Sequence, residues 1–193
     1  MGIDWTRLTV PGNACFSPTA IHLKSAPFLD VDSNGEETWV PLGQAFIPSP
    51  MGNPKDHNGD GPRYVELTNA PTEIKYGEFG THGEAPVAAV PLTCTNNGGT
   101  AAGQLLFSVA VYTRVNGQLK LLRLIAPQQA LRQGSHVTLI RVGRISSDGV
   151  TVNETWYGPN DADCCATGEA ISLWRYEAGT LRHVETRVTR RPK

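Results

Sequence analysis

The sequence predicts an all-β domain in which an antiparallel meander forms a sandwich or a partly open barrel. Glycine and proline are abundant, with 20 and 14 residues, and both favour short strands and turns over long helices. Charged residues make up only 18% of the chain, below the usual quarter. In the C-terminal half, apolar residues alternate with polar ones, which is typical of strands with one buried face.

A single domain is the expected organisation of residues 1–193, because this length buries a sizeable core. Within it we distinguish an irregular half rich in proline and glycine, residues 1–104, from a hairpin meander, residues 105–193. Each proline in the first half removes a backbone N–H that a central strand needs, so strands there should be short or lie at sheet edges. The segment from Pro48 to Pro62 contains almost nothing apolar and is predicted to be a long surface loop.

Three hairpins are predicted in the second half. The strongest joins the alternating segment 105–115 to the segment 119–125 through Asn116-Gly117, the sequence of a type I′ turn. A second turns at Asp148-Gly149, between segments 137–145 and 150–157, and a third turns near Ala178-Gly179, between segments 171–176 and 181–188.

One short helix is also expected, which would make the fold α+β. Pro127 suits a first helical position, residues 128–133 tolerate a helix, and Gly134 can end it in a left-handed conformation.

The four cysteines favour disulfides and hence an oxidising, extracellular or cell-envelope location. They form no C-x-x-C pair and have no histidine at zinc-finger spacing. The first residues do not read as a signal peptide, so we presume that a leader is absent from this sequence. If Met1 were instead native to a cytosolic protein, the cysteines would be free thiols or ligands. The cysteines are Cys15, Cys94, Cys164 and Cys165.

Three disulfide connectivities remain open. Pairing Cys15 with Cys94 closes a loop of about 80 residues and gains roughly 4 to 5 kcal/mol in the chain-entropy model. It leaves Cys164 to pair with its neighbour Cys165, which demands a distorted or cis peptide linkage. We slightly favour this pairing over the two crossed alternatives.

The net charge of -1 gives no broad field for nucleic acid, and no apolar run is long enough to span a membrane, so neither partner is predicted. Calcium is the one cofactor that the sequence suggests. Asp56, Asn58 and Asp60 precede Gly61 with the spacing of a calcium loop, and residues 30–35 repeat the pattern more weakly. Neither loop has a glutamate at the twelfth position, and a solvated turn is the competing interpretation.

No catalytic residue is predicted. The motifs G-x-S-x-G and H-E-x-x-H are absent, and the five histidines are scattered singly. A thiolate nucleophile at Cys164 or Cys165 is disfavoured, because Asp161 and Asp163 would raise the pKa of a nearby thiol. A loop closed by a disulfide is the preferred interpretation of that segment.

Aromatic residues are the predicted binding surface, because aromatic faces bind sugars and partner side chains at low entropic cost. Core packing is the alternative for each of them. The candidates are Trp156, Tyr157, Trp174 and Tyr176.

The segment 94–188 resembles the LppP/LprE-like exported actinobacterial lipoproteins and their secreted relatives. The resemblance rests on the strand that ends in Cys94, the turn at 97–100, the run Trp156-Tyr157-Gly158-Pro159, the segment 161–165 and the strand 171–176. Ala166 stands where that family commonly has proline. The resemblance implies export and a β-rich fold, and that family has no settled biochemical activity.

These observations favour a non-enzymatic secreted or envelope-associated module that recognises a protein or a cell-wall glycan through its aromatic C-terminal sheet. One alternative is a glycan-active or other hydrolase whose active site is assembled from distant residues. Another is a structural component of a secreted assembly.

Overall fold

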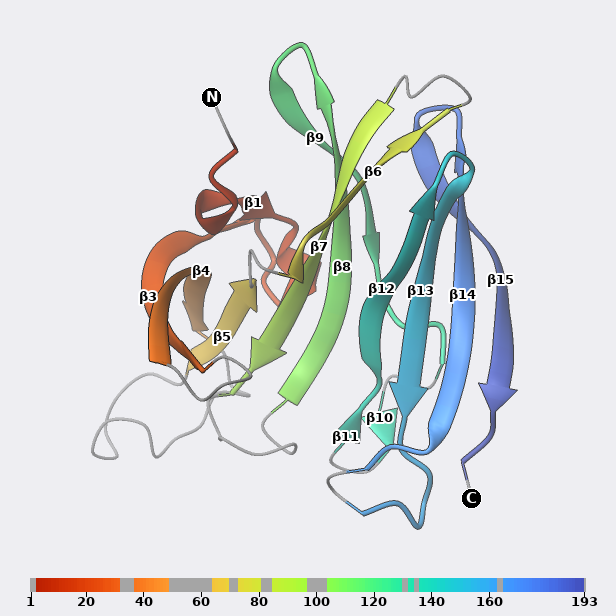
Figure 1. Cartoon of the computed structure of the whole chain (residues 1–193). Coiled ribbons are helices and arrows are strands. Elements are labelled where there is room, and N and C mark those ends of the chain that lie inside the picture. Colours follow the sequence, from red (N-terminus) through yellow and green to blue (C-terminus); the bar gives the residue numbers. More distant parts are fainter. Residues whose placement is uncertain are drawn as a thin grey trace, which may run out of the picture.

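The computed structural model confirms an all-β fold with two facing antiparallel sheets (Figure 1). It describes residues 3–31, 37–48, 64–69, 73–80, 85–96, 104–129, 132–133, 136–162 and 165–192. Side chains are described for most of these residues, with 27–31, 37–42, 48, 64–66, 132–133 and 136 as exceptions.

The larger sheet has seven strands among the described residues, in the order β3-β4-β5-β7-β8-β9, with β6 also pairing with β7. β5 and β6 occupy successive stretches of the same edge of β7, since β5 pairs with residues 93–95 and β6 with residues 85–89. The strands are β3 (Lys24–Val31), β4 (Glu37–Pro48), β5 (Tyr64–Asn69), β6 (Lys75–Phe79), β7 (Ala85–Thr95), β8 (Gln104–Val115) and β9 (Gln118–Ile125).

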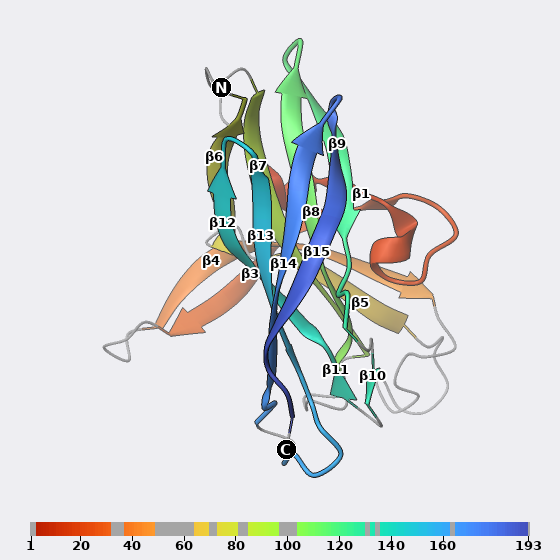
Figure 2. The ribbon, with the colours of Figure 1, turned by 90° about the vertical axis from the view of Figure 1, so that its right-hand side faces the viewer.

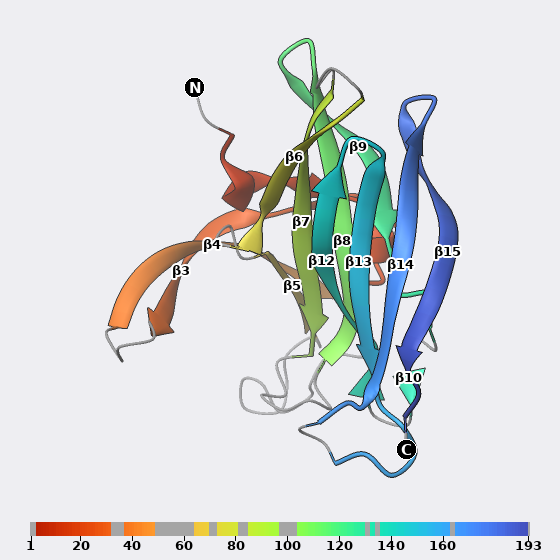
Figure 3. The same ribbon diagram turned by 45° about the vertical axis from the view of Figure 1, so that its right-hand side comes forward.

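The smaller sheet is a four-stranded meander of β12 (Leu139–Ser146), β13 (Gly149–Trp156), β14 (Gly168–Glu177) and β15 (Thr180–Arg190). A short hairpin of β10 (Arg132–Gln133) and β11 (His136–Val137) precedes it. The smaller sheet packs its inner face on β6 to β9 (Figure 3). The residues buried between the two sheets include Phe79, Val111, Ile125, Val150 and Trp174. The fold is therefore a β-sandwich.

The other face of the larger sheet is covered by the N-terminal segment, which contains the 3-10 helices η1 (Trp5–Arg7) and η2 (Gly12–Ala14) and the short strands β1 (Thr9–Val10) and β2 (Ile21–His22). Buried Asn69 joins the two layers, since its Nδ2 donates to the Trp5 carbonyl at 2.9 Å while its Oδ1 accepts from the Gly43 N–H at 3.1 Å. Tyr112 adds a second link, because its hydroxyl donates to the Thr9 carbonyl at 2.8 Å.

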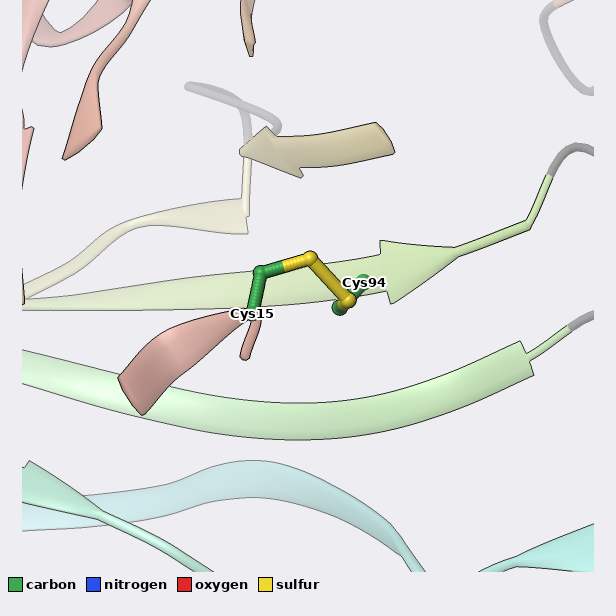
Figure 4. The surroundings of a disulfide bond; sticks show 2 residues. All are labelled: Cys15 and Cys94. Atoms are coloured by element: carbon green, nitrogen blue, oxygen red, sulfur yellow. A yellow bond between two sulfur atoms is a disulfide. The ribbon is translucent and has the colours of Figure 1, made fainter. Parts of the chain in front are cut away.

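A disulfide between Cys15 and Cys94 fixes this segment covalently to β7 (Figure 4). Both cysteines are fully buried in the core beneath the N-terminal segment. The favoured partner of Cys15 is thus confirmed. Cys165 is also disulfide-bonded, and Cys164 lies outside the described residues.

The three predicted hairpins are confirmed. Asn116 and Gly117 have φ values of 51° and 80°, as a type I′ turn requires, and Ala178 and Gly179 have φ values of 49° and 78°. The structure assigns the first hairpin to the larger sheet and the other two to the smaller one.

The expectation that strands of the N-terminal half are short or lie at edges is wrong for β4 and β7, which have 12 and 11 residues and lie inside the sheet. Their prolines are tolerated because the strands are staggered. Pro41 lies beyond the stretch of β4 that pairs with β5, which begins at Gly43. Pro91 lies in the gap between the stretches of β7 covered by β6 and by β5. Each of these prolines therefore has no partner strand on one side, and on that side no carbonyl of a neighbouring strand needs an N–H donor.

The predicted helix after Pro127 is also wrong. Residues 128–129 form a bend and residues 132–133 form β10. The N–H groups of Gln128 and Gln129 both donate to Oε2 of Glu154, at 2.8 and 3.0 Å, which fixes the bend onto β13.

Candidate binding face of the smaller sheet

The four aromatic residues predicted to form a binding platform do not form one. Trp174 and Tyr157 are buried, with 3% and 7% of their surface exposed. Tyr176 is half-buried and its ring lies 4.8 Å from that of Phe79 across the sandwich. Trp156 is half-buried at the end of β13, against Gly168. The even-numbered residues of β13 and β14 face the core, which explains why Trp156, Trp174 and Tyr176 all share the inner side.

The outer face of β12 to β15 carries arginines instead. Figure 2 looks onto this face. Paired residues of neighbouring strands point to the same side of a sheet, so the register defines rows across it. One row runs from Arg141 through Asn153 and Ile171 to Arg187. We call this surface the arginine face; its arginines, all exposed, are Arg141, Arg144, Arg175, Arg182, Arg187 and Arg190.

The arginine face has a net positive charge. The face carries six arginines and three glutamates, so its net charge is +3, whereas the net charge of the whole chain is -1. The glutamates are Glu169, Glu177 and Glu185. Arg190 pairs with Glu169 at 3.0 Å and Arg175 with Glu177 at 3.8 Å. The other arginines of the face form no ion pair with any described residue. Several guanidinium groups are therefore free to bind an external anion.

Polar groups that can form hydrogen bonds occupy the middle of the face. Thr151, Asn153 and Thr155 lie on β13 between the arginines of β12 and those of β15. Ile171 and Leu173 on β14 add a narrow apolar strip. No aromatic side chain lies on the outer face of these four strands.

Beneath the face lies a polar network built on Glu154, whose side chain is fully buried. Besides the two glutamine N–H groups, its carboxylate accepts a hydrogen bond from the Ser172 hydroxyl. Ser172 contacts Thr186 at 2.8 Å, and Thr186 contacts Nε2 of His183 at 2.8 Å. In a hydrolytic triad the imidazole lies between the carboxylate and the hydroxyl, whereas here two hydroxyls separate Glu154 from His183. The network satisfies a buried charge and has no triad geometry.

An apolar hollow of about 260 Å³ lies on the opposite side of the molecule. Trp5, Tyr76 and Tyr112 line it, and Tyr76 is 64% exposed. Burial of Tyr112 raises the pKa of its hydroxyl far above the usual value. Of these three aromatic side chains only Tyr76 is exposed, since Trp5 and Tyr112 are buried, and no sequence pattern joins the three residues.

The loop before Cys164 is fixed by Asp161. Its carboxylate accepts hydrogen bonds from the Gly158 N–H at 2.7 Å and from the Thr167 N–H at 2.9 Å, and the Thr167 hydroxyl donates to it at 2.7 Å. These bonds, that from Gly158 foremost, hold the pKa of Asp161 below its ordinary value. The aspartate has a structural role here.

Asp56, Asn58 and Asp60 lie outside the described residues, so the calcium prediction stays a prediction. Among the residues that are described, no three His, Cys, Asp or Glu side chains gather in a way that could hold a metal ion. The described part of the chain also contains no helix of the length and apolarity needed to cross a membrane.

Comparison with known proteins finds no matching family model, no matching curated protein and no matching solved structure. The resemblance to the LppP/LprE-like proteins therefore stays a prediction.

Proposed function

We propose that this chain is an exported or envelope-associated binding module without catalytic activity, and that it recognises an anionic cell-wall glycan through the arginine face. The observation that carries this proposal is the set of six exposed arginines on one side of a four-stranded sheet. The Cys15–Cys94 disulfide supports export, because such bonds persist in oxidising compartments.

Arginine suits this role better than lysine. Its planar guanidinium binds carboxylates, phosphates and sulfates through two parallel hydrogen bonds. After Lys120 the chain contains nine arginines and a single lysine, Lys193. Arg141 and Arg187 stand at the two ends of one row, three strand spacings or about 14 Å apart. A linear polymer lying across the sheet would contact both.

The composition of the face favours a glycan over a nucleic acid. Single-stranded nucleic acids are bound on aromatic stacking platforms, which this face lacks, and a face of four strands is broader than the α-helix or two-stranded ribbon that the major groove of a duplex admits. Hydroxyl and amide groups at Thr151, Asn153 and Thr155 instead match the hydroxyls of a sugar polymer.

Isothermal titration calorimetry with a polyuronate, such as polygalacturonate, tests the proposal. We expect binding that weakens with added salt and no binding of the fully methyl-esterified polymer, which has the same backbone without the charge. The variant R141Q/R187Q should bind about tenfold more weakly. The control K24Q/K120Q removes two exposed lysines from the larger sheet and should bind like the wild type.

Equal binding of the charged and esterified polymers would contradict the proposal. An equal loss of affinity in R141Q/R187Q and in K24Q/K120Q would contradict it as well. Tighter binding of a single-stranded oligonucleotide than of the polyuronate would show that the face serves a nucleic acid.

A further inference from the structure

A groove of about 410 Å³ opens beside the arginine face, between the edge of β12 and the strands β6, β7 and β8. Figure 3 shows β6 and β7 next to β12. Its volume lies in the range of small-ligand sites. The groove lies at the stretch of β7 between the residues that pair with β6 and those that pair with β5. One edge of β7 has no partner strand there, and Pro91 and Leu92 form part of the groove wall.

Lys75 bridges the groove from one sheet to the other. Its Nζ donates to the carbonyl oxygens of Val142 and Gly143, at 2.9 and 3.2 Å. An ammonium group has three N–H donors, so one remains beyond these two bonds. Lys75 forms no ion pair with a described carboxylate. The two carbonyl contacts thus hold a positive charge in place and leave one donor for a ligand.

Two further charged residues and one aromatic residue complete the site. Arg141 lines the groove and also belongs to the arginine face, while Glu73 lies on the lining without an ion pair to any described residue. Phe107 supplies an apolar surface. A ligand that fits this lining has one anionic group, several hydroxyls and an apolar ring face.

We infer that this groove binds the terminal acidic sugar of the polymer. The sugar carboxylate accepts hydrogen bonds from Lys75 and Arg141, its hydroxyls donate to Glu73, and its ring lies against Phe107. The assignment rests on the proposed function, since Arg141 joins the groove to the arginine face. It goes beyond that function by predicting that a monosaccharide binds alone and that polymer ends are recognised.

NMR titration with millimolar sodium glucuronate tests the inference, with glucose as the uncharged control. Glucuronate should shift the signals of Lys75, Phe107 and Arg141, whereas glucose should not. K75Q should weaken glucuronate binding about tenfold. K75R keeps the charge and should retain most of the affinity, and K120Q, which removes an exposed lysine of β9, should leave it unchanged.

Equal shifts by glucose and glucuronate, or no shift by either, would overturn the inference even if the polyuronate binds. A loss of affinity in K75Q that K75R fails to restore would also overturn it, provided that both variants keep the amide spectrum of the folded protein. Failure of the polyuronate to bind contradicts the proposed function separately, because that result concerns the arginine face.

Discussion

Arg175 of β14 and Arg182 of β15 lie directly opposite each other on the outer face of the smaller sheet. Like charges in this position destabilise a sheet by roughly 0.2 to 1 kcal/mol. Arg175 is partly compensated by Glu177 at 3.8 Å, whereas Arg182 has no ion pair with a described residue. A local feature that lowers stability without an evident structural gain is typical of a functional surface.

Replacing Arg182 should therefore separate stability from binding. We expect R182Q to raise the free energy of unfolding by about 0.5 kcal/mol, because it removes the repulsion by Arg175. The same variant should bind the polyuronate more weakly. Urea denaturation and calorimetry measure the two effects. R187Q is the matched control, since Arg187 stands opposite Ile171 and its removal should weaken binding without a gain in stability.

The Cys15–Cys94 disulfide should contribute a large share of the stability. The cysteines are 79 residues apart in the sequence, and closing such a loop stabilises the fold by about 4.5 kcal/mol in the chain-entropy model. The variant C15A/C94A should lose roughly this amount, measured by urea denaturation. A loss below about 1 kcal/mol would show that the unfolded chain is already compact in this region.

Glu154 should be the polar residue of the core that tolerates replacement least. In E154Q the amide oxygen can keep the N–H groups of Gln128 and Gln129, but its N–H₂ then faces the Ser172 hydroxyl, which has to change from donor to acceptor. The expected cost is about 2 to 4 kcal/mol. Hydrogen exchange at the amides of Gln128 and Gln129 should accelerate in the same variant. The exposed Glu185 offers a control, since E185Q should change stability by at most about 0.5 kcal/mol.

Asp161 should make its loop sensitive to acid. The pKa of its carboxyl in the folded protein lies below the ordinary value of 3.8, because the Gly158 N–H and Thr167 donate to the charged form. The resulting stabilisation is present above the pKa of the unfolded chain and is lost as the pH falls through the lower folded value. An NMR titration should show the Thr167 amide signal changing only at strongly acidic pH. In D161N the signal should not titrate in this range.

The hairpins of the second half could be predicted because their determinants are local. Alternation over 105–115 and the turn at Asn116-Gly117 are properties of neighbouring residues. The assignment of each hairpin to a sheet is not local, since the chain leaves the larger sheet after Ile125 and starts the smaller one at Leu139. No residue pattern in between marks that change.

The arginine face escaped prediction because it depends on β-bulges. Arg141 and Arg144 are three positions apart, so strict alternation would put them on opposite faces. The register shift between Val142 and Arg144 brings both to the outer side. A second shift, opposite Leu173 and Trp174, does the same for Arg182 and Arg187. A bulge adds a residue without a signature in the sequence here, so the shared face becomes visible only in the structure.

The proposed function requires that the outer side of the smaller sheet binds the polymer. An amide NMR footprint of a short oligogalacturonate on the folded protein tests it most directly. We predict that the largest shifts fall on Asn153 and Ile171, which lie in the row between Arg141 and Arg187, and on Thr151 beside that row. Shifts confined to Trp5 and Tyr76 in the apolar hollow, with none on β13 and β14, would contradict it.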